Sequence, residues 1–275
     1  MVTDYETGTV LVSEDAETAR YPASLTKLMT LYLLFEAVQE GRITLDQALP
    51  ISAYAASQPP TRLRLKPGSG IKVADCIDAL ILRSANDVAV VVAEALAGTE
   101  SQFAARMTRK AAGLGMTNTS FRNASGLPDD GQVTTARDLT ILVHALIKRF
   151  PEYYPHFALR SSRAAGKNIS THNNFLGAYD GVDGLKTGYT QAAGHNLAAS
   201  AVRGDHRLIG VVLGESSGGA RNHRMTLMMN QAFTALGVPL TRKGKKVAAK
   251  TGKRHRHVKI ARHRSRSRAR AASAE

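Results

Sequence analysis

The stretch YPASLTKLMTLYLLFEAVQ, residues 21–39, holds the pattern that decides how this chain folds. Residues 21–23 predict an extended lead-in, and the largely apolar residues 25–39 predict a helix, which places Ser24 at the helix N-terminus. Backbone N–H groups exposed there can stabilise an oxyanion. Ser24 and Lys27, three residues apart, share one helix face. Because a neutral lysine can accept a proton from a serine hydroxyl, the pair predicts a nucleophile and its base.

Two further motifs follow along the chain, Ser84-Ala85-Asn86 and Lys186-Thr187-Gly188. With Ser24 and Lys27 they supply a nucleophile, a base, a proton relay and a clamp for a carboxylate. The third motif directly precedes residues 189–201, whose composition predicts a strand with a break at Gly194. Residues 208–213 predict the hairpin partner of that strand. A strand edge can place a lysine and a threonine hydroxyl along a substrate backbone.

Each of these motifs is weak alone, because the chain carries a second copy of two of them. Ser69-Gly70-Ile71-Lys72 repeats the Ser-x-x-Lys spacing but follows Pro67-Gly68, a turn that a helix does not continue through. Lys250-Thr251-Gly252 repeats the third motif in a polar, basic segment without a strand. Both copies are interpreted as accidental.

The predicted elements divide the chain into strands at its ends and helices in its middle. This arrangement predicts a mixed α/β fold in which an antiparallel sheet is assembled from both termini, with a helical lobe inserted. The predicted elements are a strand at 9–13, helices at 25–40, 73–82, 86–97, 100–114, 134–148 and 218–236, and strands within 184–214.

Several stretches resemble the active-site serine penicillin-binding proteins, and among them the low-molecular-mass D-alanyl-D-alanine carboxypeptidases. They are Pro22–Thr30, Asn123–Leu127 with Thr135–Asp138, and Gly184–Thr190. The resemblance covers residues 1 to about 237. It implies a β-lactamase/transpeptidase-like fold, with an antiparallel sheet flanked by helices and a catalytic cleft between the sheet and the inserted lobe.

The resemblance also implies a role for each motif residue. Ser24 would be the nucleophile, Lys27 the acylation base and Ser84 the proton relay to the leaving amine. The remaining residues would bind substrate: Asn86 its amide, Lys186 and Thr187 its terminal carboxylate, Ser24 and Tyr189 the oxyanion through their N–H groups, and Gly188, Leu127 and Arg221 other parts of the cleft. No cofactor is implied, and no His, Cys or acidic cluster has zinc spacing.

Simpler interpretations of several of these residues stay open. Ser84-Ala85-Asn86 also fits a helix N-cap, Asn123–Leu127 fits a plain turn, and Arg224 competes with Arg221 for the carboxylate position. His195 is not assigned a catalytic role, because the lysine already fills that of the base.

The remaining sequence signals concern one thiol and the two ends of the chain. Cys76 lies among apolar residues and is interpreted as a buried structural thiol. No signal peptide is visible, and the first residues of the chain resemble the family's first hairpin beginning in the middle of its first strand. A leader and part of that strand are therefore expected to be missing. An enzyme of this family acts outside the cytoplasmic membrane, in the periplasm or an equivalent extracytoplasmic space.

The activity implied is serine-type D-Ala-D-Ala carboxypeptidase action on peptidoglycan stem peptides, with β-lactams as covalent inhibitors. A D,D-endopeptidase of the same family is an alternative. A β-lactamase is disfavoured, because Ala85 stands where class A enzymes carry aspartate and no Glu-x-x-x-Asn lies before Lys186. A non-catalytic binding protein would keep the fold but would not need three intact motifs.

Charge separates a nearly neutral domain from a basic end. The chain has 37 Lys and Arg against 22 Asp and Glu, a net charge of +15, and 14 of those cations lie in residues 241–275 with a single acid. We expect residues 1–237 to form the catalytic domain and 238–275 a disordered tail. The tail is either a solvated linker or an attachment to anionic lipid or envelope polymer; nucleic acid is not expected as its partner.

Overall fold

The main sheet joins strands from the two ends of the described chain, which in this computed structural model comprises residues 1–239. The N-terminal strands are β1 (Val2–Asp4) and β2 (Val10–Val12), and the others are β7 (Val182–Thr190), β8 (Gly194–Arg203) and β9 (His206–Glu215). Their order is β2-β1-β9-β8-β7, and every neighbouring pair is antiparallel. The predicted sheet, assembled from both termini, is therefore confirmed, with β7 at one edge.

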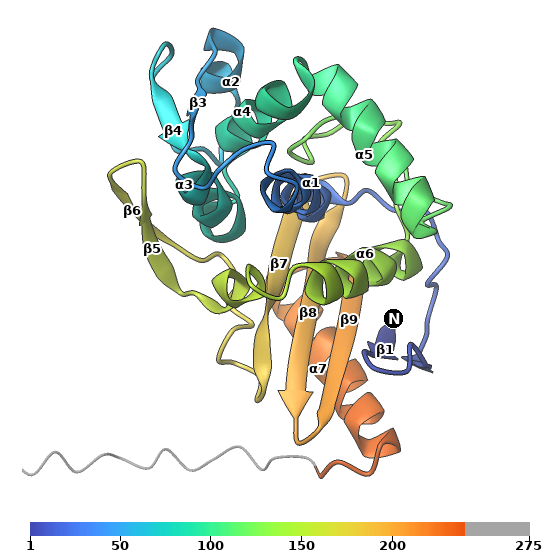
Figure 1. Ribbon diagram of the computed structural model, residues 1–275. Coiled ribbons are helices and arrows are strands. Elements are labelled where there is room, and N and C mark those ends of the chain that lie inside the picture. The colour runs from blue at the N-terminus through green and yellow to red at the C-terminus, as the bar shows by residue number, and fades with distance from the viewer. Residues whose placement is uncertain (240–275) are drawn as a thin grey trace, which may run out of the picture. The chain divides into compact units, whose positions relative to one another are not determined.

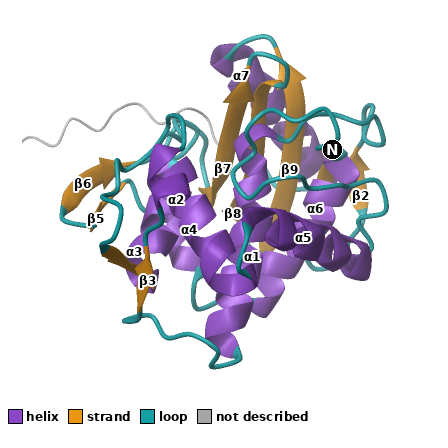
Figure 2. Ribbon diagram, turned by 90° about the horizontal axis from the view of Figure 1, so that it is seen from above, coloured by secondary structure: helices purple, strands orange, loops and turns teal. Residues whose placement is uncertain are grey.

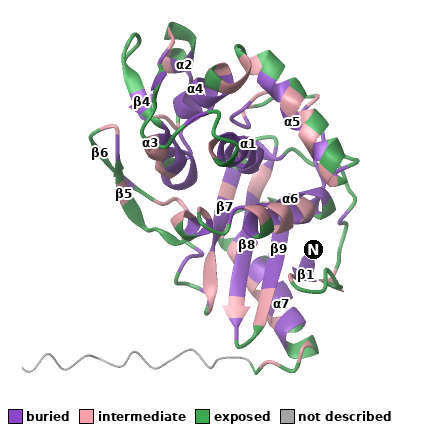
Figure 3. Cartoon of the chain, viewed as in Figure 1, coloured by how far each residue is buried: buried purple, intermediate pink, exposed green. Residues whose placement is uncertain are grey.

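Helices cover both faces of this sheet (Figure 1), α7 (Gly218–Ala235) on one and α6 (Ala136–Arg149) on the other. Because successive side chains of a strand point to opposite faces, Leu197 packs with the α7 side while Ala198 belongs to the larger core on the other side. Figure 3 shows β8 buried along most of its length, whereas the edge strand β7 mixes buried and intermediate residues. The sheet thus forms the rigid wall against which the rest of the domain packs.

The helical lobe is inserted between β2 and β7, on one side of the sheet (Figure 2). Its centre is α1 (Lys27–Gln39), nearly every residue of which is buried. Around it lie a 3₁₀ turn η1 (Ala23–Thr26), α2 (Ala53–Ser57), α3 (Val73–Asp78), a π turn η2 (Ala79–Arg83), α4 (Asn86–Ala97), α5 (Glu100–Leu114), a 3₁₀ turn η3 (Tyr154–Ala158), and the two-stranded sheets of β3 (Ala48–Pro50) with β4 (Gly70–Lys72) and β5 (Ser161–Ala164) with β6 (Lys167–Ser170).

Capping residues explain why three predicted helices begin where they do. Thr99, Thr135 and Ser217 each accept, through the side-chain hydroxyl, a backbone N–H from the first turn of α5, α6 and α7. In α5 the residues Phe103, Met107 and Ala111 recur every four positions and face the core. These helices agree with the predicted ranges to within two residues.

Three predicted elements differ from the structure. The helix expected over 25–40 begins at Lys27, and that over 73–82 is a six-residue α-helix continued by the π turn. Residues 184–214 form parts of three strands rather than two, because a turn at 191–193 separates β7 from β8, so the Lys-Thr-Gly motif lies inside β7.

A membrane-spanning helix requires a length and a hydropathy that can be compared with those of the helices within residues 1–239. No helix there is both long and apolar enough to cross a bilayer, and α4 with α5 reaches that length only as a pair bent by 81°. The predicted tail, apart from its first two residues, and the second Lys-Thr-Gly copy lie outside the described residues.

Candidate active site

One cavity of about 360 Å³, between the edge strand β7 and the helical lobe, collects nine of the ten predicted site residues. The tenth, Lys27, is buried directly behind Ser24. Motifs separated by up to 160 residues in the sequence are thus brought together. The nine residues that line the cavity are Ser24, Ser84, Asn86, Leu127, Lys186, Thr187, Gly188, Tyr189 and Arg221.

Ser24 lies in the 3₁₀ turn η1, and the helix α1, which the sequence predicts to begin directly after Ser24, begins only at Lys27. The turn is closed by the Leu25 N–H, which donates to the Pro22 carbonyl at 3.2 Å, and Ala23 has a positive φ of 47°. A side chain at Gly188 would stand 3.1 Å from the Ser24 nitrogen, tighter than most carbon contacts. Glycine therefore lets β7 approach the backbone of Ser24.

Lys27 is fully buried, and its Nζ has three neighbours. It donates to Asn86 Oδ1 at 2.7 Å and to the Ser125 carbonyl, and it lies 3.4 Å from Ser24 Oγ. Two of these neighbours accept hydrogen bonds from Nζ and the third is the Ser24 hydroxyl, so the amine lies within reach of the hydroxyl group. Burial, followed by the charge of Lys186, lowers the pKa of Lys27 well below its ordinary value.

Ser84 has the left-handed backbone conformation, with φ 56° and ψ 39°, directly after the π turn. Its Oγ is buried and has no hydrogen-bond partner within residues 1–239. Such strain and such an unpaired hydroxyl are typical of functional sites. The N-cap of α4 is Ala85, without a side-chain bond, so the structure does not support the capping alternative.

Asn86 and Lys186 contribute polar groups to opposite walls of the cavity. Asn86 is the first residue of α4. Its Nδ2 donates to the Pro59 carbonyl, and its Oδ1 accepts a hydrogen bond from Lys27 Nζ. Lys186 is buried in β7, and its Nζ donates to the Thr187 carbonyl at 3.0 Å. Burial first, and then the charge of Arg221, lower the pKa of Lys186 to about 7.

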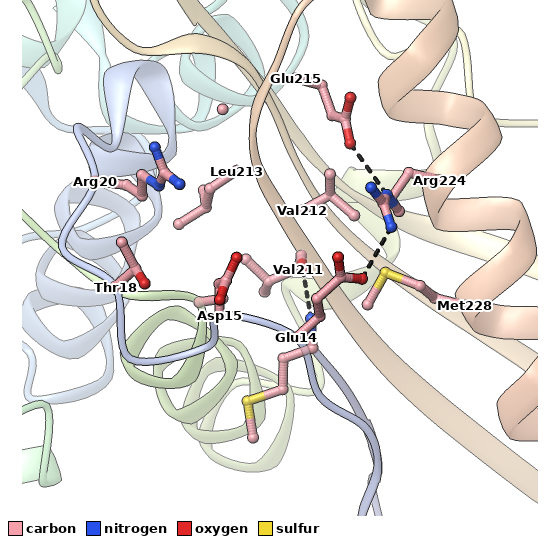
Figure 4. A pocket seen from close by; sticks show the side chains of 13 residues that line it. Glu14, Asp15, Thr18, Arg20, Val211, Val212, Leu213, Glu215, Arg224 and Met228 are labelled. Carbon is pink, nitrogen blue, oxygen red and sulfur yellow. Dashed lines mark hydrogen bonds and ion pairs between the residues drawn. The ribbon is translucent and has the colours of Figure 1, made fainter.

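Arg221, rather than Arg224, faces the cavity. Arg221 lies in the first turns of α7 and is buried, whereas Arg224 forms ion pairs with Glu14 at 2.9 Å and Glu215 at 3.2 Å beside a separate surface cavity (Figure 4). Neither Arg221 nor Lys186 has a carboxylate partner in the described part of the chain. Two adjacent cations of this kind favour an anionic ligand.

The loop Asn123–Leu127 borders the cavity and supports the base. Asn123 Oδ1 accepts the Gly126 N–H at 2.8 Å, while Ser125 turns its carbonyl toward Lys27. Gly126 has a φ of +85°, and a side chain there would overlap the Ala23 carbonyl at 1.9 Å. This segment is therefore a turn that also forms one wall of the site.

Residues outside the motifs also matter here. His172 lines the cavity, and burial together with the charge of Lys186 lowers its pKa; an isolated histidine between polar residues gave no signal in the sequence. His195 stacks on the Tyr189 ring, 4.3 Å between centroids, and does not line the cavity. Cys76 is buried, as predicted, and burial raises the pKa of its thiol. Ser69 lies in an exposed turn.

Comparison with known proteins identifies a family of similar sequences. Residues 1–217 match the sequence model of the Peptidase S11 family, described as D-alanyl-D-alanine carboxypeptidase. The chain is 35% identical to D-alanyl-D-alanine carboxypeptidase DacF of Bacillus subtilis, over 88% of this chain and 64% of the relative. It is 37% identical to DacC of Escherichia coli, over 84% and 59%. The chain thus spans less than two thirds of the length of these relatives.

Solved structures show the same fold. The D-alanyl-D-alanine carboxypeptidase DacD from Francisella tularensis superposes with a TM-score of 0.82 at 28% identity, covering 85% of this chain and 69% of that one. Penicillin-binding protein D2 from Listeria monocytogenes, in its ampicillin-bound form, gives 0.74 at 33% identity, covering 84% and 95%. The predicted β-lactamase/transpeptidase-like fold is confirmed, and the chain belongs to the D-alanyl-D-alanine carboxypeptidase family of serine peptidases.

Proposed function

We propose that this protein is a serine-type D-Ala-D-Ala carboxypeptidase that removes the terminal D-Ala from peptidoglycan stem peptides. The observation that carries the proposal is the environment of Lys27, a fully buried amine that lies 3.4 Å from Ser24 Oγ and whose pKa is lowered by that burial. The curated relatives described above are named for this reaction.

The reaction proceeds in two acyl transfers. Ser24 Oγ attacks the carbonyl carbon of the penultimate D-Ala while Lys27 takes the hydroxyl proton, and the oxyanion accepts hydrogen bonds from the N–H groups of Ser24 and Tyr189. Ser84 relays the proton held by Lys27 to the amine as the C–N bond breaks, and the terminal D-Ala departs while Lys27 becomes neutral again. Water then attacks the ester, which frees Ser24 and releases the shortened peptide as its acid.

Substrate binding uses the two ends of the cavity differently. The terminal carboxylate lies against Lys186, Thr187 and Arg221, where two cations meet a hydroxyl. Asn86 binds the substrate amide, and Leu127 supplies apolar contact at the wall. Gly188 keeps the strand free of a side chain where the peptide backbone passes.

Penicillins would acylate Ser24 and remain attached. The opened β-lactam ring stays tethered to the acyl group, so departure of a leaving group does not clear the site. No Asp or Glu is among the described residues that line the cavity, so no carboxylate is at hand to activate water for rapid hydrolysis of the ester. We therefore infer slow release of the drug.

A fluorescent penicillin and a peptide ending in D-Ala-D-Ala test this function together. We expect label on Ser24, slow loss of that label, and release of D-Ala from the peptide. Absence of label would contradict a penicillin-binding enzyme, and rapid loss would indicate a β-lactamase. Cleavage of cross-linked peptide dimers faster than release of D-Ala would assign the chain to the endopeptidase alternative.

The pH profile of kcat/KM should be bell-shaped, because the two lysines need opposite protonation states. Lys27 acts when neutral, so activity rises with pH through its lowered pKa. Lys186 binds the carboxylate when charged, so activity falls as pH rises through about 7 in the free enzyme. A bound carboxylate raises the pKa of Lys186, and the falling limb of kcat should lie at higher pH.

The variant Lys186→Arg gives the check on this assignment. Arginine stays protonated throughout the accessible range, so the falling limb should disappear from the kcat/KM profile while the rising limb remains. A falling limb that persists in this variant would show that another group is responsible for it.

We propose further that the enzyme works outside the cytoplasmic membrane, where peptidoglycan lies, and that residues 241–275 attach it to anionic lipid or envelope polymer. These residues carry 14 cations and a single acid, and each cation near an anionic membrane contributes about 1 kcal/mol.

Truncation after Pro239 should leave turnover of a soluble peptide unchanged and weaken sedimentation with anionic vesicles or cell-wall sacculi. The difference should shrink as salt rises, because exposed charges are screened over about 8 Å at physiological ionic strength. Duplex DNA serves as a competitor, since any polycation binds it non-specifically. Equal sedimentation of both forms at low salt would leave the segment a linker only.

A further inference from the structure

Asn196, in β8, is a fully buried polar residue to which the mechanism above gives no part. Its side chain makes three hydrogen bonds to the backbones of two separate segments. Nδ2 donates to the Tyr21 carbonyl at 2.9 Å and to the Pro22 carbonyl at 3.1 Å, and Oδ1 accepts the Gly214 N–H at 2.8 Å. Both amide protons are therefore used, on the chain that leads directly into Ser24.

The Pro22 carbonyl accepts two hydrogen bonds, and this shared acceptor connects Asn196 to the turn that holds Ser24. The same oxygen accepts the Leu25 N–H that closes the 3₁₀ turn around Ser24. A change in the position of this carbonyl would therefore move the turn and, with it, the Ser24 N–H. The left-handed Ala23 between them leaves the turn with an unfavourable backbone geometry that needs such support.

The other side of the oxyanion site is fixed by the same pair of strands. Asn196 pairs across the sheet with Gly188, the residue before Tyr189, and a side chain at Gly188 would stand 3.1 Å from the Ser24 nitrogen. On its other side, the β8–β9 register shifts between His195 and Leu197, and the Gly214 N–H is satisfied by Asn196 Oδ1. One side chain thus ties β9, β8 and the lead-in of the nucleophile together.

We propose that Asn196 is a positioning residue that sets the distance between the N–H groups of Ser24 and Tyr189, and so the geometry of the oxyanion site. The inference rests on the proposed function, because it assigns those two groups to the oxyanion. Asn196 touches no reacting atom. It acts by holding the Ser24 turn against β7.

Asn196→Asp and Asn196→Ala test this role in the full chain. Aspartate keeps the acceptor for Gly214 but turns an oxygen toward two carbonyls, and alanine removes all three bonds. Misplacing catalytic groups by about 1 Å costs on the order of 100-fold, so the rate constant of acylation by a β-lactam should fall about 10- to 100-fold. The preceding binding constant should stay near that of the wild type, because Lys186 and Thr187 keep their places.

An infrared measurement separates positioning from stability. Hydrogen bonds to the acyl-enzyme ester carbonyl lower its stretching frequency, so the penicilloyl enzyme of each variant, labelled with ¹³C at that carbonyl, should absorb at higher frequency than the wild type. Asn230→Ala is the control, since Asn230 bonds Tyr179 behind the sheet and does not line the cavity. It should leave both the acylation rate and the frequency unchanged.

The outcomes distinguish this inference from the function on which it rests. A wild-type protein that penicillin does not label overturns the proposed function. Wild-type labelling with unchanged acylation rate and carbonyl frequency in Asn196→Asp, measured where thermal unfolding shows the variant folded, overturns the positioning role alone. If neither variant folds, Asn196→Ser, which keeps one donor, is measured by the same two criteria.

Discussion

Replacing Ser24 by alanine should abolish both release of D-Ala and covalent labelling by penicillin. Loss of a nucleophile typically lowers kcat by on the order of 10⁴- to 10⁶-fold, and Ser24 is the hydroxyl that lies beside the buried amine of Lys27. Ser84 lines the same cavity, but no hydrogen bond joins its Oγ to another group of the described chain. The measurement is gel fluorescence after labelling, together with D-Ala release from a peptide.

Stability should hardly change in Ser24→Ala. The η1 turn has no side-chain cap, and within residues 1–239 the one hydrogen bond of Ser24 Oγ is with Lys27 Nζ at 3.4 Å, so the free energy of unfolding should stay within about 1 kcal/mol of the wild type. Ser69→Ala is the matched control, because Ser69 has the same Ser-x-x-Lys spacing but lies outside the cavity. Label on the Ser24→Ala protein would disprove the assignment.

Long periodic segments of the fold were predictable, and short or strained ones were not. Helices α4 and α5 match their predicted bounds, because apolar spacing and a Thr99 cap specify them locally. The π turn before Ser84 and the 3₁₀ turn of Ser24 carry no local sequence signal of that kind. Packing against β7 and α4 imposes them, and tertiary contacts override propensity at such places.

The sequence predicted which residues gather at the cavity, but it did not predict the contacts that support them. The three motifs supply seven of the ten predicted residues, and the family resemblance supplies Leu127, Tyr189 and Arg221; all ten lie at or behind one cavity. The Ser125 carbonyl, which orders Lys27, is a backbone group and leaves no trace in the sequence. Asn196 follows His195 within a predicted strand, and only the structure shows that its side chain reaches Tyr21 and Pro22.

The two lysines of the site differ in their surroundings. Lys27 is enclosed by Asn86, the Ser125 carbonyl and Ser24, whereas Lys186 lines an open cavity beside Arg221. Burial lowers the pKa of both groups. Under the proposed function, a bound carboxylate would raise the pKa of Lys186, which lines the cavity, more than that of Lys27, which is buried behind Ser24.

Lys27→Arg should therefore inactivate the enzyme, while Lys186→Arg should keep measurable activity. Arginine remains protonated in proteins and cannot accept the Ser24 proton, and loss of general-base catalysis alone costs about 10²- to 10⁴-fold in rate. At position 186 the guanidinium still supplies a positive charge to the carboxylate. We expect the acylation rate of Lys186→Arg to exceed that of Lys27→Arg by at least about tenfold.

The comparison requires that both variants are folded, because each places a larger cation in a buried position. Thermal unfolding gives that control, and Lys27→Met, nearly equal in length and without charge, separates loss of the base from overpacking. If Lys27→Met is as inactive as Lys27→Arg, the missing function is the proton acceptor. Equal loss of activity in Lys27→Arg and Lys186→Arg, with both folded, would contradict the division of roles, because a residue needed only as a cation tolerates another cation.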